Sequence, residues 1–191
     1  MTLQALPSTT LIYDNVEFNF NPYYNRVLTL LTEVFPSEDM TEAQKIDITV
    51  RSLSDAVPSV GVFELILHEL FPDVGKKNTR DKTMDFEQDA ALIYAAFLQT
   101  YHIDLYAERN RMDWRIFTAL LRGIPENTEL ARVIKLRSTK IPEINKHNRE
   151  YVESLIEAKR AVALKLTPEE RKRRMNQKWL EIAEGLMNVR R

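Results

Sequence analysis

The stretch that decides the fold runs from residue 85 to 128 and reads DFEQDAALIYAAFLQTYHIDLYAERNRMDWRIFTALLRGIPENT. Its large apolar residues recur at three- and four-residue steps, the period of an α-helix with one buried face. Asp85 and Asp113 stand at expected N-caps, and Gln88 completes a capping box after Asp85. Gly123 stands at the expected C′ position of the second helix. The stretch therefore predicts a compact helical unit.

Five aromatic residues in this stretch share the helical spacing. They could form a stacking platform for nucleic-acid bases. At this spacing, however, aromatic side chains more often fill a core, and we expect the core role. The residues are Tyr94, Phe97, Tyr101, Trp114 and Phe117.

The segments on either side extend the helical pattern. Upstream, Leu11-Ile12-Tyr13 precedes Asp14-Asn15, a plausible two-residue turn, and Val16, Phe18 and Phe20 then alternate with polar residues, which predicts a β-hairpin. Thr41, Ser59 and Thr128 mark further helix starts. Downstream, Pro142 precedes a long helix whose predicted apolar face comprises Ile144, Tyr151, Leu155, Ala158 and Val162. The expected fold is an all-α bundle of about seven or eight helices with a small N-terminal β-hairpin.

Composition changes suggest four parts. Residues 1–72 would hold the hairpin and three helices, and residues 73–84 (DVGKKNTRDKTM) would be a charged linker. Residues 85–166 would form a second helical subdomain, and residues 167–191 an amphipathic C-terminal helix beginning at Thr167-Pro168.

Composition also narrows the function classes. With 27 basic and 28 acidic residues the net charge is −1, which gives no global attraction to nucleic acid or anionic membrane. No apolar run approaches the ~18 residues of a membrane-spanning helix, and the N-terminus has no secretory-signal pattern. The chain has no cysteine and four glycines. We therefore expect no enzyme, no cofactor, no metal and no small-molecule substrate.

The few groups that could carry chemistry have simpler explanations. His68-Glu69 begins a zinc-protease motif, but Pro72 stands where the second histidine belongs. Asp85 and Asp89 could form an acid–base or metal-binding pair. Negative charge at a helix N-terminus explains them without either role.

The ordered segments FEQDAALIYAAFLQTYHIDL and MDWRIFTALLRGIPENT resemble the bacteriophage gene-product-fifteen family. The resemblance extends over roughly residues 16–166. His102 departs from the family pattern, since a glycine usually follows the tyrosine there, and Met112-Asp113-Trp114 replaces a leucine–histidine–tryptophan run. We expect the first change to affect how the helix ends.

The resemblance implies a tail assembly chaperone that binds the phage tape-measure protein and keeps it soluble while the tail tube polymerises. It also implies action in the host bacterial cytoplasm and absence from the mature virion. The family supplies no catalytic residues.

The C-terminal segment supplies the predicted partner-binding residues Met175, Trp179, Ile182 and Leu186. These side chains share one face of the predicted helix. If that face packs back on its own domain, it is ordinary core; if it projects, it needs a partner, in a homo-oligomer or on the client.

Two other classes remain open. A structural head–tail connector or tail-completion protein would form a closed ring and remain in the virion. A nucleic-acid-binding regulator would use the basic run at residues 171–174 and lose affinity steeply with salt. The near-neutral charge disfavours the regulator.

Overall fold

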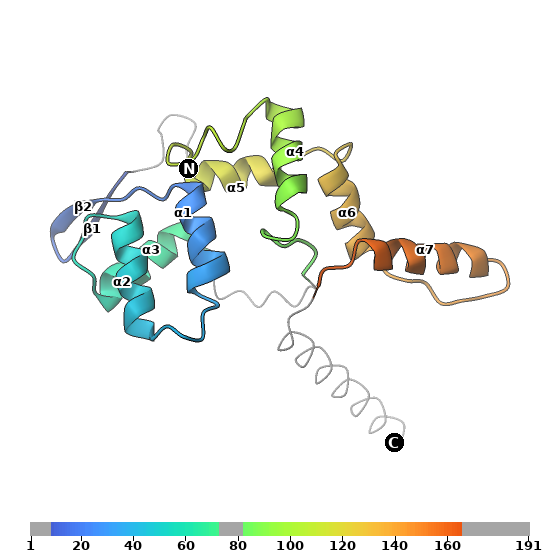
Figure 1. The fold of residues 1–191 in the computed structure, drawn as a ribbon, viewed down its shortest axis with the longest axis horizontal. Helices are drawn as coiled ribbons and strands as arrows, with labels where there is room; N and C mark the ends of the chain where they lie inside the picture. Colours follow the sequence, from blue (N-terminus) through green and yellow to red (C-terminus); the bar gives the residue numbers. More distant parts are fainter. Residues whose placement is uncertain (1–8, 73–81, 166–191) are drawn as a thin grey trace, which may run out of the picture. The chain divides into compact units, whose positions relative to one another are not determined.

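The computed structural model describes residues 9–72 and 82–165. Within them the chain forms seven α-helices, one π-helical segment and one two-stranded antiparallel sheet, which confirms the predicted all-α fold with a small hairpin (Figure 1). In chain order the elements are β1 (Thr10–Tyr13), β2 (Val16–Asn19), α1 (Tyr24–Thr29), η1 (Leu30–Val34), α2 (Glu42–Leu53), α3 (Val60–Leu70), α4 (Ala90–Tyr101), α5 (Trp114–Arg122), α6 (Glu129–Ser138) and α7 (Arg149–Ala161).

The chain divides into two compact units, Met1–Thr139 and Lys140–Arg191. Within the first unit, elements from both sides of residues 73–81 pack together, since α1 contacts both α2 and α5 (Figure 1). The charged linker predicted at 73–84 stays a prediction, because residues 73–81 lie outside the described part of the chain. The second unit contains α7.

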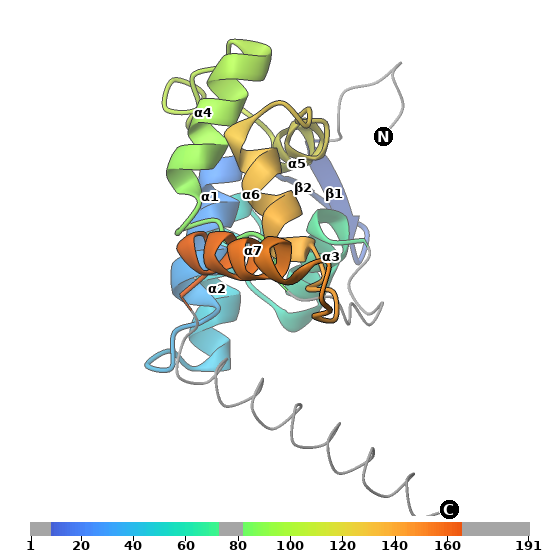
Figure 2. The same ribbon diagram turned by 90° about the vertical axis from the view of Figure 1, so that its right-hand side faces the viewer.

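The predicted hairpin is present, and its turn explains its register. Asp14 and Asn15 both adopt positive φ angles, 51° and 61°, as a two-residue hairpin turn requires. Tyr13 then pairs with Val16, and Leu11 with Phe18. The hairpin lies beside α3, as Figure 2 also shows.

Two contacts secure the hairpin to the helices. Phe18 and Phe20 are buried in the main core. At the end of β2, the Asn19 N–H donates to the Asp55 carboxylate at 2.7 Å, and the Asn19 side-chain amide donates to the same carboxylate at 2.6 Å. Phe20 also forms an isolated antiparallel bridge with Ser54, which joins the end of the hairpin to the residue after α2.

The helix starts predicted from local capping are largely confirmed. Thr41 and Gln44 form a complete capping box at α2. The side chains of Ser59, Asp113 and Thr128 accept backbone N–H bonds at α3, α5 and α6. Each cap satisfies N–H groups that a helix leaves without partners in its first turn.

The start of α4 differs from the prediction. Asp85 does accept bonds from the N–H groups of Glu87 and Gln88, but these close only a turn, and α4 begins at Ala90. The side chain that accepts from the Asp85 N–H is Asp89, at 2.9 Å, in place of the Gln88 expected for a capping box. Asp89 has this orientation because it also binds Arg137.

The left-handed residue expected at Gly123, after α5, is found instead at His102, after α4. His102, after α4, takes the left-handed conformation with φ 55° and ψ 29°. Gly123, after α5, has φ −86° and is not left-handed. A side chain at Gly123 would instead place its Cβ 2.9 Å from the Tyr101 hydroxyl, so close packing explains this glycine.

The face predicted for the helix after Pro142 is correct at Leu155, which is buried, and wrong at Ile144 and Tyr151. The helix begins only at Arg149, and Ile144 and Tyr151 are 62% and 59% exposed. The buried positions of α7 are Val152 and Leu155. The delay has a local cause: Asn145 and Asn148 use their side chains to bond neighbouring backbone groups, an alternative to helix that asparagine favours.

Candidate partner-binding site

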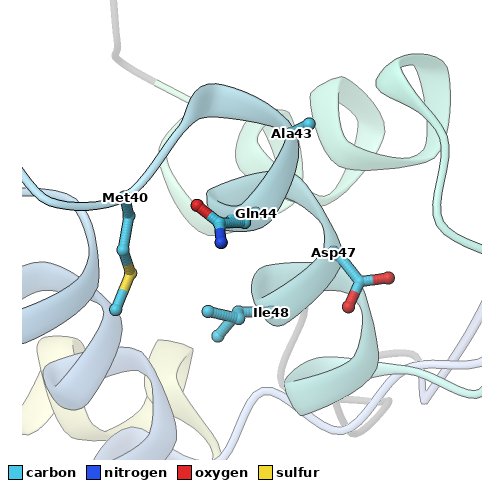
Figure 3. Close-up of a pocket in the computed structure, with 5 residues that line it drawn as sticks. All are labelled: Met40, Ala43, Gln44, Asp47 and Ile48. Carbon is cyan, nitrogen blue, oxygen red and sulfur yellow. The ribbon is translucent and has the colours of Figure 1, made fainter.

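A hollow beside the first turns of α2 is one pocket among the described residues (Figure 3). Its volume is about 340 Å³, and it opens to solvent. It is lined by Met40, Ala43, Gln44, Asp47 and Ile48. In Figure 3 the side chains of Met40 and Ile48 face each other, whereas Asp47 points away from them.

Local hydrogen bonds hold the walls of this hollow in place. The Gln44 side-chain oxygen accepts from the Thr41 N–H at 2.8 Å and from the Thr41 hydroxyl at 3.0 Å. The Lys45 ammonium donates to the Phe35 carbonyl at 3.2 Å, which ties the segment before α2 to the helix. The hollow is therefore formed before any partner arrives, which lowers the entropic cost of binding.

The chemistry of the hollow suits an apolar side chain. Met40, Ala43 and Ile48 contribute apolar surface. The Asp47 carboxylate already pairs with Arg51 at 2.8 Å, and the amide oxygen of Gln44 is engaged by Thr41. A protein partner that inserts an aliphatic or aromatic group fits these walls better than a charged ligand does.

The predicted carboxylate pair has structural partners. Asp89 is only 2% exposed in its side chain and receives the Arg137 guanidinium at 2.6 Å. Asp85 pairs with Lys82 at 2.7 Å. Burial by itself would raise the pKa of Asp85, but the N–H groups of Gln88 and Glu87 together with Lys82 lower it below the usual value. Both carboxylates thus serve the start of α4.

No grouping of three metal-ligating side chains occurs among residues 9–72 and 82–165. Glu69, the neighbour of His68 in the partial protease motif, lies 3.7 Å from the Arg115 guanidinium. His102 forms the end of α4. In the same ranges, no helix has the length and apolarity needed to cross a membrane.

The five aromatic residues considered as a stacking platform belong to the core or pack against it. Phe97 and Phe117 are fully buried and stack with their ring centroids 5.1 Å apart, and Trp114 stacks on Phe117 at 5.6 Å. Tyr101 packs edge-on against Phe97. Tyr94 differs, because it pairs with Tyr106, a residue at the surface. Sequence spacing identified the core aromatics but gave no sign of Tyr106.

The four predicted partner-binding residues, Met175, Trp179, Ile182 and Leu186, lie outside the described part of the chain, as does the basic run at 171–174. The hollow on α2 was missed by sequence reasoning. The sequence gives little sign of this hollow. Met40 stands in a polar segment, and Ala43 and Ile48 belong to a helix whose strongest apolar stripe faces the core.

Comparison with known proteins gives one match. A family model described as "Bacteriophage Gp15 protein" matches residues 5–164. No curated protein and no solved structure matches the chain. The match covers most of the chain, including the segments on which the resemblance was based.

Proposed function

The chain belongs to the bacteriophage Gp15 family, which makes it a phage structural or morphogenesis protein, and on that premise we propose that it is a tail assembly chaperone. In this role it binds the tape-measure protein and keeps it soluble until tail-tube subunits polymerise around it. The observation that carries the proposal is the family match over residues 5–164.

Features of the folded unit support this role. A tape-measure protein is a long helix with apolar stripes, so a chaperone must offer surfaces that accept the apolar side chains of a helix. The preformed hollow beside Met40 and Ile48 is one such surface. Many copies, each binding weakly along one client, would gain avidity and could still be displaced one by one.

The proposal includes further properties of the protein. It acts as a homo-oligomer or as many copies on one client, in the host bacterial cytoplasm, and is absent from the mature virion. It performs no catalysis and requires no cofactor. Its partner contacts include Met175, Trp179, Ile182 and Leu186 of the C-terminal segment.

The test is co-expression with the tape-measure protein of the same phage, followed by affinity capture and size-exclusion light scattering. We expect a soluble complex with many copies of this chain for each client. The control is the tape-measure protein expressed alone or with an unrelated helical protein of similar size, where it should precipitate.

The opposite result points to the alternative role. If the tape-measure protein precipitates in every arm while this chain runs as a closed ring of fixed mass, the chaperone proposal fails. Recovery of the chain from purified virions would then support a head–tail connector or tail-completion protein.

A further inference from the structure

The outward side of α4 has an unusual composition. None of its 12 residues, AALIYAAFLQTY, is charged. Every other α-helix in the described parts of the chain contains at least one charged residue. Even so, the exposed residues of α4 are Ala90, Ala91, Ala95, Leu98 and Gln99, with Leu98 exposed by 43%. A helix face in contact with water normally carries several charged or polar residues, so a face with Gln99 as its single polar side chain is atypical for permanent contact with solvent.

A pair of tyrosines, one half-buried and one exposed, adjoins these residues. Tyr94, one turn before Leu98, packs against Tyr106 with ring centroids 5.1 Å apart. Tyr106 itself is 71% exposed. We call the surface made by Ala91, Tyr94, Ala95, Leu98 and Tyr106 the α4 outer face.

The exposure of Tyr106 does not come from a loose loop. The Asp104 carboxylate accepts a bond from the Tyr106 N–H at 2.9 Å and another from the Tyr94 hydroxyl. Burial and this carboxylate raise the pKa of Tyr94 above its usual value. The next residue, Leu105, is buried, and its carbonyl accepts a bond from the Tyr24 hydroxyl.

Tyr106 lies in the loop between α4 and α5, residues 102–113, and the other end of this loop is also held in place. The Asn110 N–H donates to the Asn25 side chain at 2.9 Å, and the Asn110 side-chain oxygen accepts from Arg26 at 3.0 Å. Both ends of the loop are thus fixed to α1. The structure holds a large aromatic ring in solvent at a defined position, which is the arrangement of a binding surface prepared in advance.

The size of the face limits what can cover it. A helix of 12 residues is about 18 Å long and about 10 Å wide, which gives roughly 200 Å². A stable protein dimer buries about 800 Å² on each partner, roughly four times as much. The face alone is therefore too small to sustain a dimer, but it suits one of many weak contacts along a longer partner.

We propose that the α4 outer face is a docking site for an uncharged, apolar face of a helix in the client protein. Ala91 and Ala95 are one turn apart and have small side chains, which lets a partner helix approach closely. Leu98 and the Tyr94–Tyr106 pair border the alanines with larger apolar surface. The identity of the client rests on the proposed chaperone function. The apolar character of the face rests on the exposed residues of α4 alone.

The test uses the full chain co-expressed with the tape-measure protein of the same phage, comparing wild type with Ala95→Glu and Ala95→Arg. Either charge would be stripped of water against an uncharged partner helix, so we expect both variants to retain roughly tenfold less soluble client. The matched control is Ala119→Glu, at an exposed alanine within α5, which should retain client as wild type does. Circular dichroism of each free variant checks the fold.

Three results would overturn the docking site. If wild type and both Ala95 variants hold the client equally, the chaperone function stands and α4 is not the contact. If only one sign of charge is harmful, the contact is electrostatic and the partner face is charged. If Ala95→Glu instead lowers the mass of the free protein in light scattering, the face joins two copies of this chain. Failure of wild type itself to hold the client contradicts the proposed function.

Discussion

Arg137 donates a hydrogen bond to each carboxylate oxygen of Asp89, with N–O distances of 2.6 and 2.9 Å. The same guanidinium donates to the Thr83 carbonyl at 3.0 Å. The pair joins the last turn of α6 to the residue before α4, 48 positions earlier, and is almost fully removed from solvent. Two charges removed from water stabilise a fold only when each has its partner.

Removing one partner of this pair should therefore be costly. We expect Arg137→Met to lower the free energy of unfolding by about 3–5 kcal/mol, since the Asp89 carboxylate would stay buried without its countercharge. Chemical denaturation followed by circular dichroism measures the loss. The Asp89→Asn variant should also lose stability.

The double variant Asp89→Asn with Arg137→Met provides the control. Its loss should be clearly smaller than the sum of the two single losses, because the second change no longer breaks an intact pair. Strictly additive losses would mean that the two side chains act independently.

This pair also shows where sequence reasoning stops. Caps at Thr41, Asp113 and Thr128, and the Asp14-Asn15 turn, depend on residues within three positions, so their pattern is visible in the sequence. Asp89 depends on Arg137, and nothing local reveals that contact. The sequence assigned the start of α4 to Asp85 because that assignment needed only neighbouring residues.

Surface sites are harder to predict for a related reason. The core aromatics were predictable because burial follows helical periodicity. The hollow beside Met40 and the ring of Tyr106 depend on how separate segments pack, and periodicity carries no information on that. The π-helical turn at Leu30–Val34 was likewise unforeseen, since its bond from the Phe35 N–H to the Leu30 carbonyl spans five residues.

His102 is a site where a substitution should stabilise the protein. Its φ of 55° is costly for a residue with a Cβ but not for glycine. We expect His102→Gly to raise the free energy of unfolding by up to about 1 kcal/mol, because glycine relieves the strain but loses more entropy on folding. The control is His102→Ala, which retains a Cβ and should not stabilise. Equal gains from both variants would assign the effect to the imidazole.

Gly61 leaves room for the ring of Tyr13, which joins β1 to α3. A Cβ at Gly61 would lie 1.9 Å from the Tyr13 hydroxyl oxygen and 2.3 Å from the adjoining ring carbon. Gly61→Ala should therefore displace the ring, and because Tyr13 is 42% exposed and can move, the free energy of unfolding should fall by no more than about 1 kcal/mol.

A double variant tests whether the Tyr13 ring causes the loss of stability. If the ring is the obstacle, adding Gly61→Ala to a Tyr13→Ala protein should cost almost nothing, as measured by denaturant unfolding. An undiminished cost would indicate that the α3 backbone, and not Tyr13, requires glycine at this position.

Asp85 should contribute stability that depends on pH. Its pKa is lowered in the folded protein, so the ionised carboxylate stabilises the fold fully above the unfolded pKa of about 3.9. That contribution is lost as the pH falls through the lower, folded pKa. Wild type should therefore be more stable than Asp85→Asn at pH 7, and the gap should narrow as the pH falls below about 4. Unfolding curves across this range test it, and a gap that is undiminished at the lowest pH would contradict the role of the carboxylate.

The C-terminal segment offers the last prediction. Deleting residues 167–191 should leave a folded monomer that neither oligomerises nor holds client, because the apolar stripe predicted from the sequence to contain Trp179 and Leu186 would be gone. Each such side chain contributes about 1.5–3 kcal/mol when buried, so Trp179→Glu with Leu186→Glu should reproduce the deletion in light scattering and client co-expression. The matched control, Arg171→Gln with Arg173→Gln, changes the basic run and should leave both properties intact. If the control fails and the apolar variant does not, the segment acts through charge.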